Sequence, residues 1–168
     1  MCLAVPELRL GFSAYLQHLF QGMDLTDGAG NLSPLLLLAN NLRACAVTML
    51  YGLIPFVRLP ALALGVNAVL LGGLAACYAA TDTTMLLYAA SLLPHGIFEL
   101  PALILAFSMG LYICGHLTRR CRRDPAALPL GACLGLAARL LVFLLLPLLI
   151  LAALTEAYVT PLAAGLFL

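Results

Sequence analysis

The sequence predicts an all-α integral membrane protein, a helical bundle with about four transmembrane helices. Of its 168 residues, 64% are apolar and only 9% carry a charge, and the mean hydropathy is +1.11. Soluble domains of this length do not have such a composition. The chain has room for about four helices of roughly 20 residues, the length that crosses the hydrocarbon core of a bilayer. A single membrane domain with short connections is therefore expected.

Residues 1–33 are expected to form an N-terminal amphipathic segment at the membrane interface, before a transmembrane domain over residues 34–168. The segment has neither a basic start nor a clean apolar centre, so it does not resemble a cleavable signal peptide. Its apolar residues recur near helical spacing, which favours an interfacial helix: Leu8, Phe12, Tyr15, Leu16 and Leu19. An additional crossing within residues 3–23 is the alternative.

Prolines, glycines and short polar stretches divide the rest of the chain into the expected spans. These spans cover approximately residues 35–57, 61–80, 85–114 and 132–154. The third is expected to break at Pro94, His95 and Gly96, because proline cannot donate the helical hydrogen bond. Small residues in the second span permit close helix contact, so a homodimer or a larger assembly is expected to form there: Gly65, Gly72 and Gly73.

The arginines predict the orientation of the bundle, since positive charge concentrates on cytoplasmic loops. Arg58 lies between the first two spans, and four arginines lie within residues 119–123. Loops 58–60 and 115–131 are therefore expected in the cytoplasm. Residues 81–84 and the C-terminus are then expected on the opposite side, together with the N-terminal segment.

Six polar residues are expected to converge just below the extracytoplasmic surface: Asn40, Asn41, Arg43, His95, Glu99 and Glu156. Residues three or four apart share a helix face, so His95 can act with Glu99, and Asn40 with Arg43. Ionisable groups inside a membrane usually mark functional sites. Arg43 would then neutralise Glu99 or Glu156, while His95 binds a ligand, a proton or a metal. Alternatively, each charge snorkels to the interface and His95 caps a broken helix end.

Metal binding is one hypothesis for this site. His95, Glu99 and Glu156 supply the three imidazole and carboxylate ligands that a catalytic zinc ion takes, whereas a purely hydrogen-bonded network is the alternative. Cys114, His116 and Cys121 form another nominal ligand set, but their spacing matches no established zinc pattern. The six cysteines indicate no disulfide framework. Residues 119–123 are interpreted as a topology determinant that contacts anionic lipid, and nothing in the sequence supports nucleic-acid binding.

Three motifs resemble those of the stage II sporulation protein M family. They are NN-x-R at residues 40–43, LLPHGIFELPA at residues 92–102 and EAYVTP at residues 156–161. The resemblance implies a polytopic protein of the bacterial inner membrane. It also implies peptidoglycan-remodelling partners, because the sporulating members belong to a complex with peptidoglycan-degrading proteins that drives septal thinning and engulfment.

Two classes of function remain open, and whether the protein is an enzyme stays undecided between them. In the first, it is a non-enzymatic scaffold or regulator of envelope-remodelling partners. In the second, the polar site is catalytic or transporting, with Glu99 or Glu156 as acid and base and His95 as metal ligand or proton carrier. The sequence contains no recognisable catalytic motif, which favours the scaffold.

Overall fold

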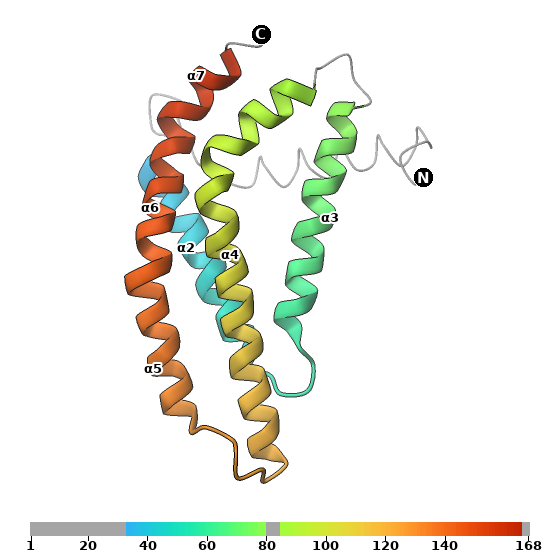
Figure 1. The fold of residues 1–168 in the computed structure, drawn as a ribbon, viewed down its shortest axis with the longest axis vertical. Helices are drawn as coiled ribbons and strands as arrows, with labels where there is room; N and C mark the ends of the chain where they lie inside the picture. Colours follow the sequence, from blue (N-terminus) through green and yellow to red (C-terminus); the bar gives the residue numbers. More distant parts are fainter. Residues whose placement is uncertain (1–32, 80–84, 166–168) are drawn as a thin grey trace.

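The structure, a computed structural model, describes residues 33–79 and 85–165, and this part of the chain is helical without strands (Figure 1). The all-α prediction is therefore confirmed for these residues. The predicted N-terminal segment, except for Ser33, and the predicted outer loop 81–84 lie outside the described residues. The elements are α2 (Pro34–Leu50), the 3-10 turn η2 (Tyr51–Leu53), α3 (Leu59–Ala79), α4 (Met85–Cys121), α5 (Leu130–Leu140), the π-turn η3 (Leu141–Leu145), α6 (Leu146–Leu154), the π-turn η4 (Thr155–Val159) and α7 (Thr160–Gly165).

Three helical stretches in the described residues are long and apolar enough to cross a membrane. They are Pro34–Leu53, Gly96–Cys121 and Leu130–Leu162, with mean hydropathies of 1.3, 1.9 and 2.6. In α3 the corresponding apolar stretch, Leu59–Gly73, is shorter. Three of the four predicted spans thus meet this criterion.

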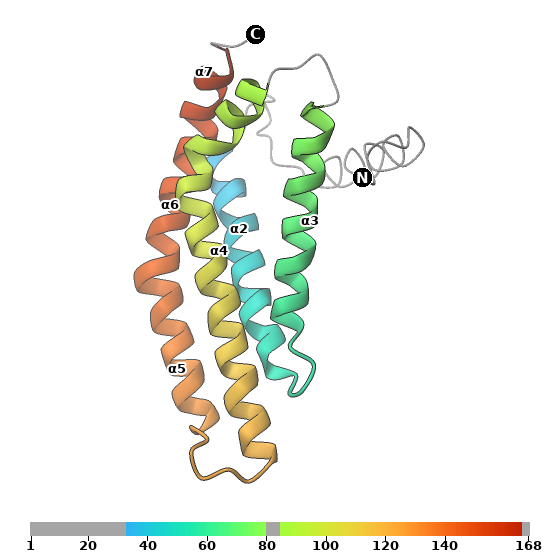
Figure 2. The same cartoon turned by 45° about the vertical axis from the view of Figure 1, so that its right-hand side comes forward.

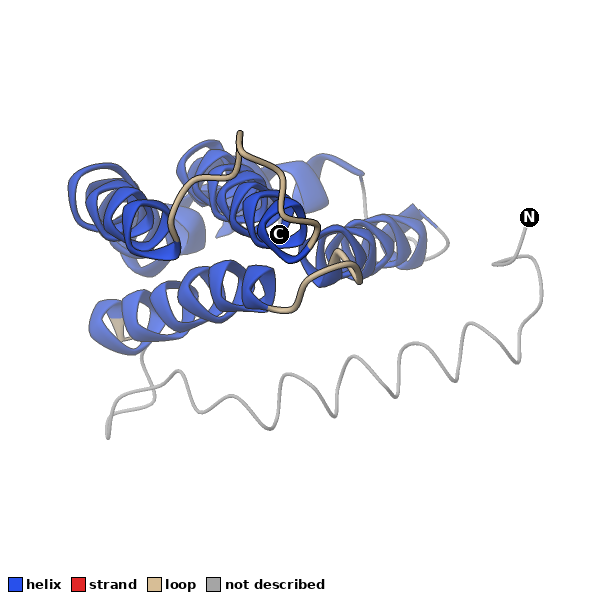
Figure 3. Cartoon of the chain, turned by 90° about the horizontal axis from the view of Figure 1, so that it is seen from below, coloured by secondary structure: helices blue, strands red, loops and turns tan. Residues whose placement is uncertain are grey.

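Helix α4 is the centre of the bundle and contacts α2, α3 and α6 (Figures 1 and 2). Seen from below, the long helices stand beside one another (Figure 3). One face of α4 packs against α2 and against the last rod, the continuous helical segment from α5 to α7. The core between them consists of Cys45, Met49, Ala102, Ala106, Met109, Ile113, Cys133, Ala137, Leu145 and Leu149. The core residues of α4 are spaced by three and four, so they form a single stripe. Many large apolar side chains remain on the outside, as expected for a lipid-facing surface.

Helix α4 does not show the predicted interruption. Pro94 and Pro101 both lie inside a continuous helix, although its ribbon bends in the N-terminal part (Figure 1). Each proline removes one helical hydrogen bond, and a bend accommodates this loss. Helix α4 also continues to Cys121, about two turns beyond the expected end at Cys114. Arg119 and Arg120 occupy its last turn, where cations interact favourably with the helix dipole.

The last rod, α5 to α7, contains two π-turns, and each precedes a proline. In η3 the amide of Leu146 donates to the carbonyl of Leu141, and Pro147 follows directly. In η4 the amide of Thr160 donates to the carbonyl of Thr155, and Pro161 follows. A proline ring clashes with the carbonyl four residues earlier in a regular helix. We attribute the local shift in register to this clash, and π-turns of this kind are frequent at functional sites.

Candidate intramembrane carboxylate site

Two glutamates from distant parts of the chain meet in the bundle. Glu99 belongs to α4 and Glu156 belongs to η4, and their side chains interact electrostatically. Glu99 also interacts electrostatically with the thiol of Cys45 on α2. Three helical segments thus contribute to one site. Both carboxylates are half-buried, so the surrounding protein restricts their access to solvent or lipid.

Helix α2 presents a buried face to this site. Cys45 is fully buried, and Asn41, one turn earlier on the same face, is only 9% exposed. Asn41 is one of two polar residues among the buried residues of the described chain, the other being Thr48. Sequence reasoning included Asn41 but missed Cys45. The available signal was the four-residue spacing from Asn41, which places both on one side of the helix.

Local structure around Glu156 is anchored by threonine hydroxyls. The Oγ1 atom of Thr155 donates to the carbonyl oxygens of Leu151 and Ala152. The Oγ1 atom of Thr160 donates to the carbonyl oxygen of Thr155 over 3.2 Å. These bonds link the π-turn to the helical turns on both sides. The bonds therefore stabilise the local backbone conformation at Glu156.

Arg43 does not neutralise either carboxylate in this structure. Its side chain is exposed, and it forms no ion pair with a described residue. Arg43 lies two residues from both Asn41 and Cys45, so it points away from their shared face. Asn40 is half-buried on the flank nearer to Arg43. The structure thus brings Glu99 and Glu156 together, with Asn41 on the adjoining buried face, and leaves Arg43 outside.

His95 lies on α4 one turn before Glu99, but its side chain is outside the part that the structure describes. The predicted set of His95, Glu99 and Glu156 therefore stays a prediction. Among described side chains, no group of three or more His, Cys, Asp or Glu residues could hold a metal ion.

His116, which belongs to the second nominal ligand set with Cys114 and Cys121, makes structural contacts. The Nδ1 atom of His116 accepts a hydrogen bond from the amide of Leu128 over 3.1 Å. Its ring packs edge-on against Tyr112, with 4.5 Å between the ring centroids. The hydrogen bond ties the connection after α4 back to the helix, and the ring contact lies within α4 itself.

The arrangement at Glu99 and Glu156 has definite chemical possibilities. Two neighbouring carboxylates that form no ion pair with a described cation can bind a cation, carry a proton or accept hydrogen bonds from a partner helix. The geometry does not select one of these, because the same acceptor oxygens serve all three.

Comparison with known proteins supports the resemblance seen in the sequence. A family model described as stage II sporulation protein M matches residues 11–161. The match spans most of the chain and includes all six predicted site residues. No curated protein and no solved structure matches the chain.

Proposed function

Because the chain belongs to the stage II sporulation protein M family, we propose that it is a non-enzymatic scaffold or regulator of envelope or septal peptidoglycan-remodelling complexes. It would act as a multi-pass protein of the bacterial inner membrane. Helix α3, with 21 residues, is about 30 Å long, close to the thickness of the hydrocarbon core, and would be the fourth crossing. The Pro94 to Gly96 region would be the point where α4 bends below the outer surface.

The open face of α3 is the observation that supports a scaffold. A Cβ atom added at Gly65 or Gly72 would meet no other atom within 4 Å. Large apolar side chains beside them are exposed: Leu62, Val66 and Val69. Glycines on a membrane helix let a second helix approach closely. This face would therefore hold a second copy of the chain, and the resulting homodimer would bind the peptidoglycan-remodelling proteins.

Isoleucine substitutions on this face test the proposal. The double variant Gly65→Ile and Gly72→Ile adds side chains where the protomer has space, so it should fold and insert normally. Cross-linking in native membranes should show loss of the dimer, and affinity isolation should show loss of co-purifying peptidoglycan hydrolases. Gly131→Ile with Gly135→Ile is the matched control, because these glycines of α5 also have no neighbour within 4 Å. Equal behaviour of both double variants, or no hydrolase with the wild type, would contradict the scaffold.

The meeting of Glu99 and Glu156 favours a second candidate, a metal-dependent enzyme or transporter. In this candidate His95, Glu99 and Glu156 would hold zinc, and the carboxylates would carry protons. Metal analysis of the purified protein tests it: one zinc per chain, lost on Glu99→Gln, supports it. A metal-free protein whose His95→Ala and Glu99→Gln effects simply add would exclude a shared site.

A further inference from the structure

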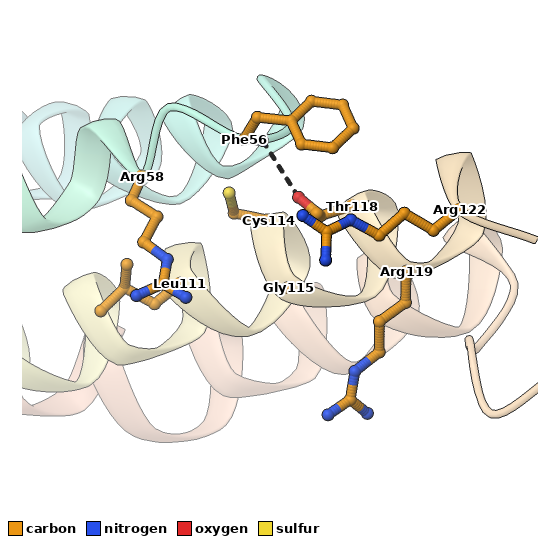
Figure 4. A pocket seen from close by; sticks show the side chains of 8 residues that line it. All are labelled: Phe56, Arg58, Leu111, Cys114, Gly115, Thr118, Arg119 and Arg122. Carbon is orange, nitrogen blue, oxygen red and sulfur yellow. Dashed lines mark hydrogen bonds between the residues drawn. The ribbon is translucent and has the colours of Figure 1, made fainter. Parts of the chain in front are cut away.

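A cavity of about 490 Å³ lies between the connection after η2, residues 54–58, and the C-terminal part of α4. Arg58 from the connection lines it, together with Arg119 from the last turn of α4 and Arg122 just after that helix (Figure 4). We call this cavity the arginine pocket. The sequence placed Arg58 and the arginine cluster on one side of the membrane, but it did not indicate that they share a cavity.

The connection is fixed to α4 by specific contacts. The amide of Phe56 donates a hydrogen bond to Oγ1 of Thr118 over 3.0 Å (Figure 4). The Sγ atom of Cys114 donates to the carbonyl oxygen of Ile54 over 3.4 Å. The guanidinium carbon of Arg122 lies 5.8 Å from the centroid of the Phe56 ring, within cation–π range. These three contacts hold the pocket wall against α4.

The backbone of the connection is held in an unusual conformation. Phe56 has φ 69° and Arg58 has φ 50°, a left-handed region that residues other than glycine rarely adopt. Such conformations persist only where surrounding contacts impose them, and they cluster at ligand-binding sites. In this protein the conformation directs the chain so that Arg58 and Phe56 both line the pocket.

The charge of the pocket is not compensated within the described chain. Arg58, Arg119 and Arg122 form no ion pair with a described acidic residue. Asp124, the acidic residue nearest in sequence to the cluster, accepts a hydrogen bond from the amide of Ala126 over 2.8 Å. Thr118 accepts one hydrogen bond through its hydroxyl oxygen and still has its proton to donate. The pocket therefore offers three cations and one hydroxyl donor.

We infer that the arginine pocket binds a phosphate group. The planar guanidinium group matches two phosphate oxygens at once, which makes arginine well suited to this ligand. The pocket lies at the end of the apolar spans Pro34–Leu53 and Gly96–Cys121, where phospholipid headgroups are located. The exposed side chains of Phe56 and Val57 beside it are apolar and suit the adjoining acyl chains. An anionic phospholipid is the source favoured by this position, and a soluble phosphate compound is the other source.

Lipid titration of the full-length protein in mild detergent tests the inference, with native mass spectrometry to count bound lipids. Phosphatidylglycerol should bind at one saturable site, and Arg58→Gln with Arg122→Gln should weaken it roughly 10-fold or more, since charge-assisted hydrogen bonds are lost. Arg120→Gln with Arg123→Gln removes the same charge, but neither residue lines the pocket. This control should change the affinity less than about twofold, because charges that do not contact the phosphate are screened by solvent.

Further measurements separate the alternatives. Arg58→Lys keeps the positive charge but lacks the planar guanidinium group that donates two parallel hydrogen bonds. A several-fold loss of lipid affinity is therefore expected, and this variant also serves if the double variant folds poorly. Inorganic phosphate and glycerol 3-phosphate are then added to the protein with bound phosphatidylglycerol. Displacement of the lipid by either compound would assign the site to a soluble ligand, and retention of the lipid would assign it to phospholipid. Equal losses in the two double variants, or no saturable binding of any of these probes, would overturn the inference.

Discussion

Gly52 of η2 and Gly110 of α4 lie so close that a Cβ atom on Gly52 would overlap the carbonyl oxygen of Gly110. The reverse is also true of the neighbourhood, because a Cβ on Gly110 would lie 2.8 Å from both the carbonyl oxygen of Thr48 and Cγ of Pro60. Both glycines are buried. The backbone at the end of α2 therefore contacts the backbone of α4 directly, as small residues permit in membrane bundles.

Gly110→Ala should lower the free energy of unfolding by about 1–3 kcal/mol, because backbone atoms around it cannot move aside cheaply. Unfolding in mixed detergent micelles, followed by circular dichroism, measures the effect. Gly115→Ala on the same helix is the control, since its Cβ would meet nothing within 4 Å. The control should be neutral or stabilising by up to about 1 kcal/mol. Equal stability of the two variants would contradict the close crossing.

Glu99→Gln and Glu156→Gln should show non-additive effects on the free energy of unfolding. Neutralising one carboxylate removes its interaction with the other, so the second substitution has less to remove. A coupling energy of about 0.5 kcal/mol or more is expected for neighbours. Glu99→Gln with Asp124→Asn is the control pair and should be additive, because Asp124 follows α4 at its opposite end. Additive effects in both cycles would show that Glu99 and Glu156 do not interact.

Pro161→Ala should weaken this coupling, because the π-turn η4 can then return to α-helical register and rotate the residues around Glu156 relative to α4. The same double-mutant cycle, repeated in the Pro161→Ala background, measures the change. Pro147→Ala is the matched control, since η3 carries no residue of the site. An unchanged coupling energy in both backgrounds would show that the proline does not position Glu156.

Cys121 should be cytoplasmic, according to the distribution of arginines. Its side chain is exposed, so a variant retaining only this cysteine should react with a membrane-impermeant maleimide after permeabilisation but not in intact spheroplasts. A cysteine introduced at Thr83 in a cysteine-free background should show the opposite pattern. Labelling of Cys121 from outside would invert the predicted orientation.

The sequence by itself determined the class of the protein, most of its spans and its family. Helical crossings depend on the length of apolar runs, and the break between spans depends on prolines and polar residues that are local in sequence. The local sequence also identified Glu99 and Glu156 as ionisable residues within apolar helices, where a charge is energetically unfavourable. It overstated the effect of Pro94, because α4 continues through that residue and a bend accommodates the lost hydrogen bond.

Tertiary structure decided which polar residues meet. The rotation of α2 brings the Asn41 and Cys45 face inward and leaves Arg43 outside, and the register shift before Pro161 sets the position of Glu156. The backbones likewise approach closely at Gly52 and Gly110, and Arg58 lines one pocket with residues from the end of α4. Rotation, crossing and register arise from contacts between segments far apart in the chain. The local pattern of apolar and polar residues does not specify them, because a lipid-facing surface and a helix-facing surface are both apolar.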